Sequence, residues 1–325
     1  MTQPNNPAPN AALTGRDTPI DGVCRLTDMG VIQAAGEDAT NFLHNQLTQD
    51  FAQLGATEAR LAALCTAKGR MQASFVGLKH GGDILLVCSQ DLLAPTLKRL
   101  SMFVLRAKVK LTDASAVFDV YGLAGRAVAD NAGDASLAPW ALREVNGASV
   151  VGLYPAEGGT PRALWVAPAR STDPVGAALS ADDWTWGEVT SGVATLTAPV
   201  VEAFVPQMLN YESVGGVNFK KGCYPGQEVV ARSQFRGTLK RRAYIVHSES
   251  ALSAGDEVFH RTDEATAGGE SCGTVVRAAP APGGGFDAIV SMQVTAANGG
   301  RLSAQSHDGP ALVLLPLPYP LLADI

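Results

Sequence analysis

Cys223 is the residue whose surroundings in the chain are best suited to chemistry. It follows Lys220, Lys221 and a glycine, and it precedes the turn sequence Tyr-Pro-Gly at 224–226. Residues 227–231 can continue from this turn as a helix that has a proline in its first turn. The unpaired N–H groups and the positive dipole end of a helix start, together with the two lysines, favour a thiolate over a thiol. The pattern therefore predicts a reactive cysteine.

The other four cysteines have no comparable setting. Cys65 and Cys88 lie inside apolar segments and are predicted to be small buried hydrophobic residues. The five cysteines are odd in number, scattered and without a C-x-x-C pair, which argues against a disulfide framework and a structural zinc site. A cytoplasmic location is therefore expected, and residues 1–20 lack the basic start and apolar run of a secretory signal.

The sequence also narrows the chemistry that Cys223 could perform. None of the five histidines forms a pairing motif with it, so a cysteine protease is unsupported, although pairing in space stays open. A single cysteine cannot supply the four thiolates that an iron–sulfur cluster typically takes. The remaining interpretation is a transient role, either as a ligand completed by a partner or as a thiol that accepts sulfur or an alkyl group.

Positive charge is concentrated around this cysteine. Residues 220–242 contain seven Lys or Arg and one Glu, a net charge of +6, whereas the whole chain carries −6 and the remainder therefore −12. One interpretation is a solvated helix face, which is the usual role of a charge run. The other is an anion-binding surface for a polycarboxylate, a phosphate or an RNA backbone, although the aromatic residues of a nucleic-acid platform are sparse here.

Strands and helices alternate through the first two thirds of the chain and must position this cysteine. Helices are expected over 36–50, 91–105, 125–133 and 174–184, and extended segments over 22–35, 60–79, 84–89, 108–123, 148–154 and 162–168. Hairpins among the strands favour a mixed α+β fold over a doubly wound parallel sheet. The chain has no G-x-G-x-x-G and no P-loop, so no dinucleotide or Walker site is predicted.

The character of the chain changes after residue 238. Short apolar runs between 241 and 315, separated by Gly, Pro and Asp turns, predict a small all-β module such as a barrel. The predicted organisation is a disordered tail over 1–20, an α+β region over 21–239 and a β-barrel over 240–325. The apolar tract near the C-terminus is broken by prolines and too short to span a bilayer, so no membrane partner is expected.

Several stretches of the chain form a set together with the octamer KGCYPGQE at 221–228. They are GEDATNFLHNQLTQD at 36–50, CTAKGRMQASF at 65–75 and the closing PLPYPL. This set resembles the YgfZ family of folate-binding proteins, which are relatives of the glycine-cleavage T-protein. The family's hallmark K-G-C-Y-x-G-Q-E occurs here without a mismatch, and the resemblance spans roughly residue 24 to the C-terminus.

The resemblance implies both a fold and a function. The fold has two related, interleaved α+β subdomains that bind folate, here 21–239, and a C-terminal β-barrel, arranged as a ring around a channel. The implied function is tetrahydrofolate binding in support of iron–sulfur cluster assembly or repair, which indirectly affects tRNA modification. The family's key functional residue corresponds to Cys223, so Cys223 and its neighbour Lys221 are the catalytic candidates. The implied partners are iron–sulfur client or assembly proteins, and the basic segment 220–242 offers a contact for tRNA.

A folate-binding role also involves residues elsewhere in the chain. A pterin needs an aromatic or apolar surface and a few directed polar groups. Trp184 is the candidate for that surface, because a tryptophan near this point faces the folate in relatives, whereas Trp186 is expected to pack in the core. Lys68, Arg70 and the basic cluster at 232–242 could bind the anionic folate tail. The remaining candidates for folate contact are Met29, Tyr224, Gln227 and Glu228.

One departure from the T-protein pattern bears on the activity. T-protein relatives carry a glutamate that holds the pterin two residues before the glycine of EVTSG, but here this position is Thr190, and the nearest acid is Glu188. The missing glutamate argues against the first alternative function, a folate-dependent aminomethyltransferase of the glycine-cleavage type. The second alternative is a non-catalytic module that binds RNA or protein through the basic segment. The sequence alone does not establish catalytic turnover.

Overall fold

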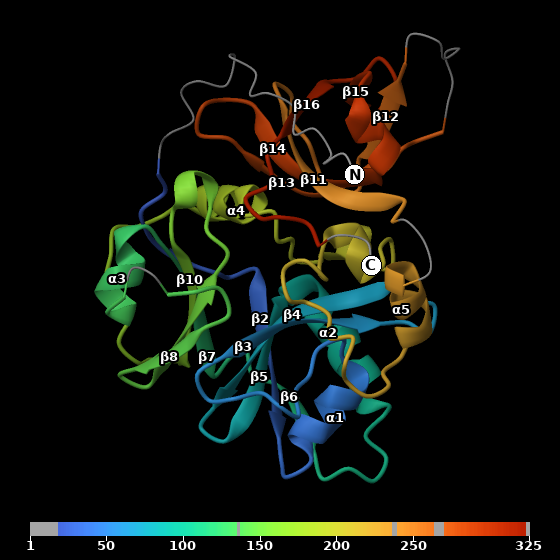
Figure 1. The fold of residues 1–325 in the computed structure, drawn as a ribbon. Coiled ribbons are helices and arrows are strands. Elements are labelled where there is room, and N and C mark those ends of the chain that lie inside the picture. The colour runs from blue at the N-terminus through green and yellow to red at the C-terminus, as the bar shows by residue number, and fades with distance from the viewer. Residues whose placement is uncertain (1–18, 135–136, 236–238, 263–269, 323–325) are drawn as a thin grey trace.

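The computed structural model describes residues 19–134, 137–235, 239–262 and 270–322 and contains three β-structures (Figure 1). They are two five-stranded sheets and a closed six-stranded barrel. Every strand pair in the described sheets and barrel is antiparallel. The predicted mixed α+β fold with a C-terminal barrel is therefore confirmed.

The first sheet packs against helices on one face and against the second sheet on the other. In spatial order its strands are β3 (Ala59–Cys65), β4 (Met71–His80), β5 (Asp83–Ser89), β2 (Met29–Ala35) and β6 (Lys110–Asp113). Helices α1 (Ala39–Gln46) and α2 (Gln90–Ser101) cover its outer face. Successive side chains of a strand point to opposite faces, so Leu86 joins the helices whereas Leu85 and Val87 face the second sheet.

The second sheet contains the first strand of the described chain. In spatial order its strands are β1 (Gly22–Arg25), β7 (Phe118–Ala124), β10 (Arg162–Pro168), β9 (Ala148–Leu153) and β8 (Leu142–Val145). Helix α3 (Arg126–Ala132) packs on its outer face through Ala127 and Val128. Because β1 lies in this sheet and β2 in the first, the chain crosses between the sheets early. The sequence pattern did not predict β8.

The helix expected over residues 174–184 begins later than predicted. Helix α4 spans Ala181–Thr190, and the hydroxyl of Ser180 caps its first turn. The residues before it are extended along β1, since both backbone groups of Val23 bond to this segment, at 2.8 and 2.9 Å. The prediction was wrong over 174–180, because pairing with an edge strand satisfies the backbone groups that a helix would otherwise have paired.

The barrel follows the last helix, α5 (Gln227–Phe235). The helix begins after Pro225, which was predicted to lie in its first turn, because Gly226 has a φ of +81° and cannot be helical. In spatial order the barrel strands are β11 (Arg241–Ser248), β14 (Phe286–Gln293), β13 (Gly273–Pro280), β12 (Glu257–Arg261), β15 (Arg301–Ala304) and β16 (Ala311–Leu315). The pattern did not predict β15. Short 3₁₀ helices occupy Glu157–Gly159, Ala198–Val200, Pro206–Leu209 and Val294–Asn298. Helix α4 packs on the barrel, and the indole N–H of Trp186 donates to buried Asp287 at 2.8 Å (Figure 1).

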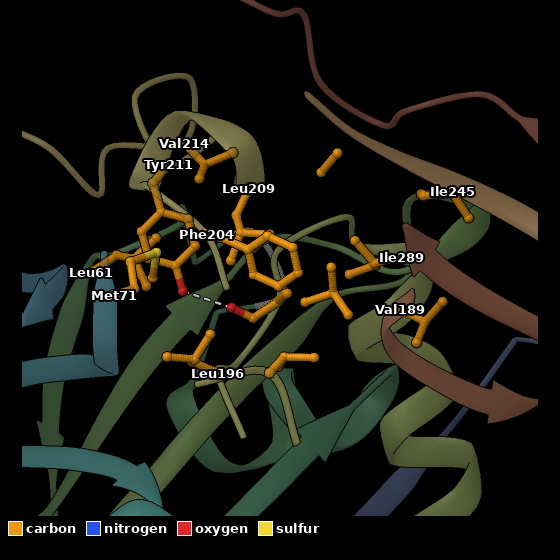
Figure 2. Packing of buried hydrophobic residues seen from close by; sticks show 14 of the residues in the cluster. Leu61, Met71, Val189, Leu196, Phe204, Leu209, Tyr211, Val214, Ile245 and Ile289 are labelled. Atoms are coloured by element: carbon orange, nitrogen blue, oxygen red, sulfur yellow. Dashed lines mark hydrogen bonds between the residues drawn. The ribbon is translucent and has the colours of Figure 1, made fainter. Parts of the chain in front are cut away.

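A single buried cluster joins both sheets, α4 and the barrel. Figure 2 labels side chains from the first sheet, α4, the barrel and the loop between α4 and α5, among them Leu61, Met71, Val189, Leu209, Ile245 and Ile289. Tyr211 is fully buried in this loop and donates its hydroxyl to Ala194 O at 2.6 Å. Burying one such aliphatic side chain contributes about 1.5–3 kcal/mol, so the cluster fixes the loop that leads to Cys223.

Candidate functional site

Cys223 is exposed, whereas Cys24, Cys65, Cys88 and Cys272 are buried. Burial raises the pKa of Cys65 and Cys88 to about 12, because a thiolate in an apolar interior loses its hydration. These two thiols therefore stay protonated under ordinary conditions. The sulfur of Cys223 is the one that a molecule in solution can reach.

Lys221 holds the loop that carries Cys223 against the end of α1. Its Nζ donates to Leu47 O at 2.7 Å and to His44 O, and it lies 4.9 Å from the centre of the Tyr224 ring. The last carbonyls of a helix lack intrahelical partners, so the ammonium caps α1. Burial lowers the pKa of Lys221 to about 8, against the attraction of nearby acidic groups. The lysine is thus placed as an anchor that is still protonated at pH 7.

Two glycine turns meet at the start of α5. Gly226 has a φ of +81°, and Gly69, in the Lys-Gly-Arg turn between β3 and β4, has a φ of +72°. A Cβ on Gly226 would lie 2.3 Å from Thr66 O and 2.8 Å from Gly69 N, so this approach requires glycine. The turn of the β3–β4 hairpin therefore supports the octamer that contains Cys223.

The other predicted folate-contact residues near these two turns differ in their exposure to solvent and in their bonding partners. Lys68 is exposed, and Arg70 donates to a backbone carbonyl in the loop that follows α4. Tyr224 is buried and Gln227 is half-buried. Glu228 is exposed and forms an ion pair with an arginine one helical turn later. The turns therefore present charges of both signs to solvent.

The basic segment 220–242 does not form one continuous cationic surface. Arg242 is buried, and its Nη1 lies 2.6 Å from Oε1 of buried Glu212. Lys221 is buried as well, and Arg236 lies outside the described residues. The exposed basic residues of the described part are Lys220, Arg232 and Lys240. Arg242 cannot serve a phosphate while it neutralises Glu212, because a buried carboxylate needs its counter-charge.

A cavity lies between the two sheets, next to α4. It contains about 610 Å³ of empty space, including the part that is open to solvent. Met29 of β2 and Trp184 of α4 both line it. Other apolar residues of its lining include Leu26, Leu61, Phe75, Val76, Trp140 and Leu164. A mostly apolar hollow with a few polar groups is the form that small-molecule sites take.

Arg162, the first residue of β10, is a candidate that the sequence interpretation missed. It lines the cavity, is 4% exposed, and places its guanidinium 4.3 Å from the centre of the Trp184 ring. Its Nε has no hydrogen-bond partner, and Nη1 reaches Tyr154 O only at 3.5 Å. Burial lowers its pKa to about 10, against the raising effect of Glu188. The sequence feature that could have identified Arg162 is its position as a charged residue at the start of the apolar strand RALWVAP.

Glu188, not Thr190, faces the cavity. Glu188 is buried and belongs to the lining residues. Its Oε1 accepts the N–H of Thr195 at 2.9 Å and lies 3.7 Å from Arg277 Nε. The hydroxyl of Thr190 instead donates to Trp186 O, within its own helix, at 3.0 Å. The lining of the cavity therefore contains a carboxylate, two residues before position 190.

The predicted site residues fall into two groups. Met29 and Trp184 lie in the cavity. The residues around the two glycine turns are absent from its described lining: Cys223, Lys221, Tyr224, Gln227, Glu228, Lys68 and Arg70. The β3–β4 hairpin connects the groups, because both of its strands line the cavity and its turn packs against Gly226.

Comparison with known proteins relates this arrangement to a family. No family model matches the chain. The tRNA-modifying protein YgfZ of Cronobacter sakazakii is 28% identical over 332 residues, which cover 98% of this chain and 97% of the relative. The protein of the same name from an Enterobacter species is 29% identical over 312 residues, covering 91% and 92%. The resemblance to the YgfZ family is confirmed.

The fold agrees with the YgfZ resemblance. The crystal structure of the glycine cleavage system aminomethyltransferase T from Bartonella henselae matches with a TM-score of 0.64, covering 92% of this chain and 86% of that one. Sequence identity is 14%, so this likeness shows a shared T-protein-like fold and no more. In the described part of the chain, no helix is both long and apolar enough to cross a membrane.

Proposed function

We propose that this protein binds tetrahydrofolate in the cavity between its sheets and uses the thiol of Cys223 to support iron–sulfur cluster assembly or repair. The observation that carries the proposal is Arg162, a buried cation in the lining of an otherwise mostly apolar cavity. A hydrogen bond to a charged group contributes about 1.5–3 kcal/mol, so a bound acceptor that reaches the guanidinium would be held there. The names of the YgfZ relatives add tRNA modification, which the protein would affect indirectly, in the cytoplasm.

The residues of the cavity suit a pterin. Its flat ring system can be enclosed by apolar side chains such as Met29 and Trp184. Its N–H donors and carbonyl acceptor match the carboxylate of Glu188 and the guanidinium of Arg162. Glu188 would then take the part of the glutamate that the T-protein pattern places at position 190. When bound, tetrahydrofolate would supply a carrier for one-carbon groups.

The proposal also gives roles to the residues outside the cavity. Lys68 and Arg70 stay candidates for the carboxylates of the folate tail, because their turn joins two strands that line the cavity. The thiol of Cys223 is exposed and can reach a partner protein, so it can complete a ligand set or accept a group from outside. Lys221 supports it by fixing the loop.

Folate binding can be tested by titration calorimetry with tetrahydrofolate under anaerobic conditions. Arg162→Met should weaken binding roughly tenfold to a hundredfold, which corresponds to one lost charge-assisted hydrogen bond. Arg143→Met is the matched control, since Arg143 lies on β8 of the same sheet but pairs with Asp134 outside the cavity lining. The assignment of the cavity is wrong if the Arg162 variant binds as tightly as the control.

The role of the thiol requires a separate measurement. Cys223→Ser should keep the unfolding midpoint and the tetrahydrofolate affinity, because the side chain is exposed. The same variant should fail to restore the activity of an iron–sulfur enzyme in cells that lack the wild-type protein. Full complementation by the serine variant would remove the thiol from the proposed function.

Neither alternative function gains a supporting observation of its own. Aminomethyl transfer is the activity in the name of the solved neighbour, but the likeness to that protein concerns the fold. An RNA-binding module would have to use the basic segment 220–242, in which Arg242 is committed to Glu212. Turnover of an aminomethyl-carrying lipoyl protein would support the aminomethyltransferase function. Salt-sensitive binding of tRNA would support the RNA-binding function.

A further inference from the structure

The fold brings a histidine next to Gly222, the residue that precedes Cys223, although the sequence contains no pairing motif for the histidine and the cysteine. His44 lies in the last turn of α1, and a Cβ placed on Gly222 would be 3.5 Å from its Nε2. Lys221 maintains this arrangement, because its ammonium binds the carbonyl of His44 itself. In Figure 1 the chain that leads into α5 passes beside α1. The imidazole therefore faces the loop at the residue before the exposed thiol.

Asp50 fixes the orientation of this imidazole. Its Oδ1 lies 2.9 Å from His44 Nδ1 and also accepts the N–H of Gln53 at 3.0 Å. Although burial acts in the other direction, the hydrogen bonds from Gln53 and His44 lower the pKa of Asp50, so it is a carboxylate at neutral pH. A carboxylate at Nδ1 selects the tautomer with the proton on that nitrogen. The lone pair of the neutral imidazole is then on Nε2, which faces Gly222.

We propose that His44 is the proton acceptor for the thiol of Cys223 and that Asp50 and Lys221 are its positioning residues. The inference rests on the proposed thiol function and adds the base that this function needs. As the sulfur attacks an electrophilic carbon or sulfur, the S–H proton passes to His44 Nε2 and a new S–C or S–S bond forms. The leaving group departs with the electron pair of the broken bond, and His44 then returns the proton to it or to water.

The charged groups around the pair are consistent with this role. Besides the carboxylate of Asp50, the loop has the ammonium of Lys221, which is attracted to Cys223 and would stabilise the thiolate once the proton has left. Arg60 reaches the backbone carbonyl of Asp50 at 3.4 Å, and its own charge is paired with Glu58 at 2.7 Å. The surroundings therefore supply one anion, Asp50, at Nδ1 of the imidazole and one cation, Lys221, beside the loop.

The test is the rate at which iodoacetamide alkylates the full-length protein. The other four cysteines are buried, so the fast reaction reports on Cys223, and Cys223→Ser should abolish it. At pH 7, His44→Gln should slow the reaction roughly tenfold or more, and Asp50→Asn several-fold. His80→Gln is the matched control, since His80 bonds to Ser149 through Nδ1 at 2.9 Å on another part of the first sheet and should leave the rate within about twofold.

Chemical rescue separates a proton acceptor from a packing residue. His44→Ala should be slow, and added imidazole at millimolar concentration should restore much of its rate, whereas imidazole should not change the wild-type rate. The gap between the wild type and His44→Gln should narrow at alkaline pH, because hydroxide then removes the thiol proton without help from a neighbouring base. A wild-type rate in His44→Gln overturns the proposal, and so does a slow His44→Ala that imidazole does not rescue.

These rates are independent of the tests of the proposed function. They require neither folate nor an iron–sulfur client, so a negative result would remove the histidine as base and leave folate binding and complementation as they stand. Conversely, a Cys223→Ser protein that complements fully would end the proposed role of the thiol. The measured coupling between His44 and Cys223 would remain as a property of the protein.

Discussion

Replacing Gly226 by alanine should destabilise the protein more than an ordinary glycine substitution does. Gly226 has a φ of +81°, a conformation that costs an L-residue about 1–2 kcal/mol. The new Cβ would also lie 2.3 Å from Thr66 O and 2.8 Å from Gly69 N, both of them backbone atoms that cannot rotate away. Forcing the two turns apart adds about 1–3 kcal/mol of strain, so we expect a total loss of about 3 kcal/mol in the free energy of unfolding.

Gly147→Ala separates the two contributions. Gly147 has nearly the same φ, +83°, but no atom lies within 4 Å of the place where its Cβ would stand. This variant should therefore lose only the conformational part, about 1–2 kcal/mol. Urea unfolding of both variants beside the wild type gives the comparison. Alkylation of Cys223 should change in Gly226→Ala and not in Gly147→Ala, and equal losses of stability would refute the close packing of the two turns.

Three further substitutions test the buried polar groups. In the folded protein the pKa of Lys221 is about 8, below its ordinary 10.5, so between these values the unfolded chain binds more protons. The stability difference between wild type and Lys221→Met, followed by urea unfolding, should therefore shift in favour of the wild type from pH 8 to 10.5. Arg242→Met leaves Glu212 buried without its cation and should cost about 3–5 kcal/mol by the same assay. Trp186→Phe leaves an oxygen of buried Asp287 without its indole donor and should cost about 1–3 kcal/mol, seen as a lower Tm.

Local patterns were sufficient for most of the fold. The hairpin of β3 and β4 follows from two apolar runs around a Lys-Gly-Arg turn, and α1 from helical spacing within 36–50, because both signals lie inside one element. The helix placed at 174–184 failed for the opposite reason. There the competing structure is pairing with β1, a partner about 150 residues earlier, and no local pattern reports such a partner.

The site shows the same division between local and distant information. The exposure of Cys223 was predictable, since its neighbours are polar, cationic and rich in glycine. His44 was not predictable as its neighbour, because the contact depends on Lys221 bonding to a helix end far away in the chain. Arg242 looked like part of a basic surface, and only the fold reveals that Glu212 neutralises it in the interior. Charge counts along a segment describe composition, not which side chains reach solvent.

The β3–β4 hairpin explains how two separate groups of residues can belong to one function. Leu61 of β3 and Phe75 of β4 line the cavity, while the turn between these strands lies against Gly226 with no space for a single methyl group. The hairpin therefore contacts both the cavity and the loop that carries Cys223. Displacing its turn would also displace the octamer at Gly226, because the two backbones are already in close contact.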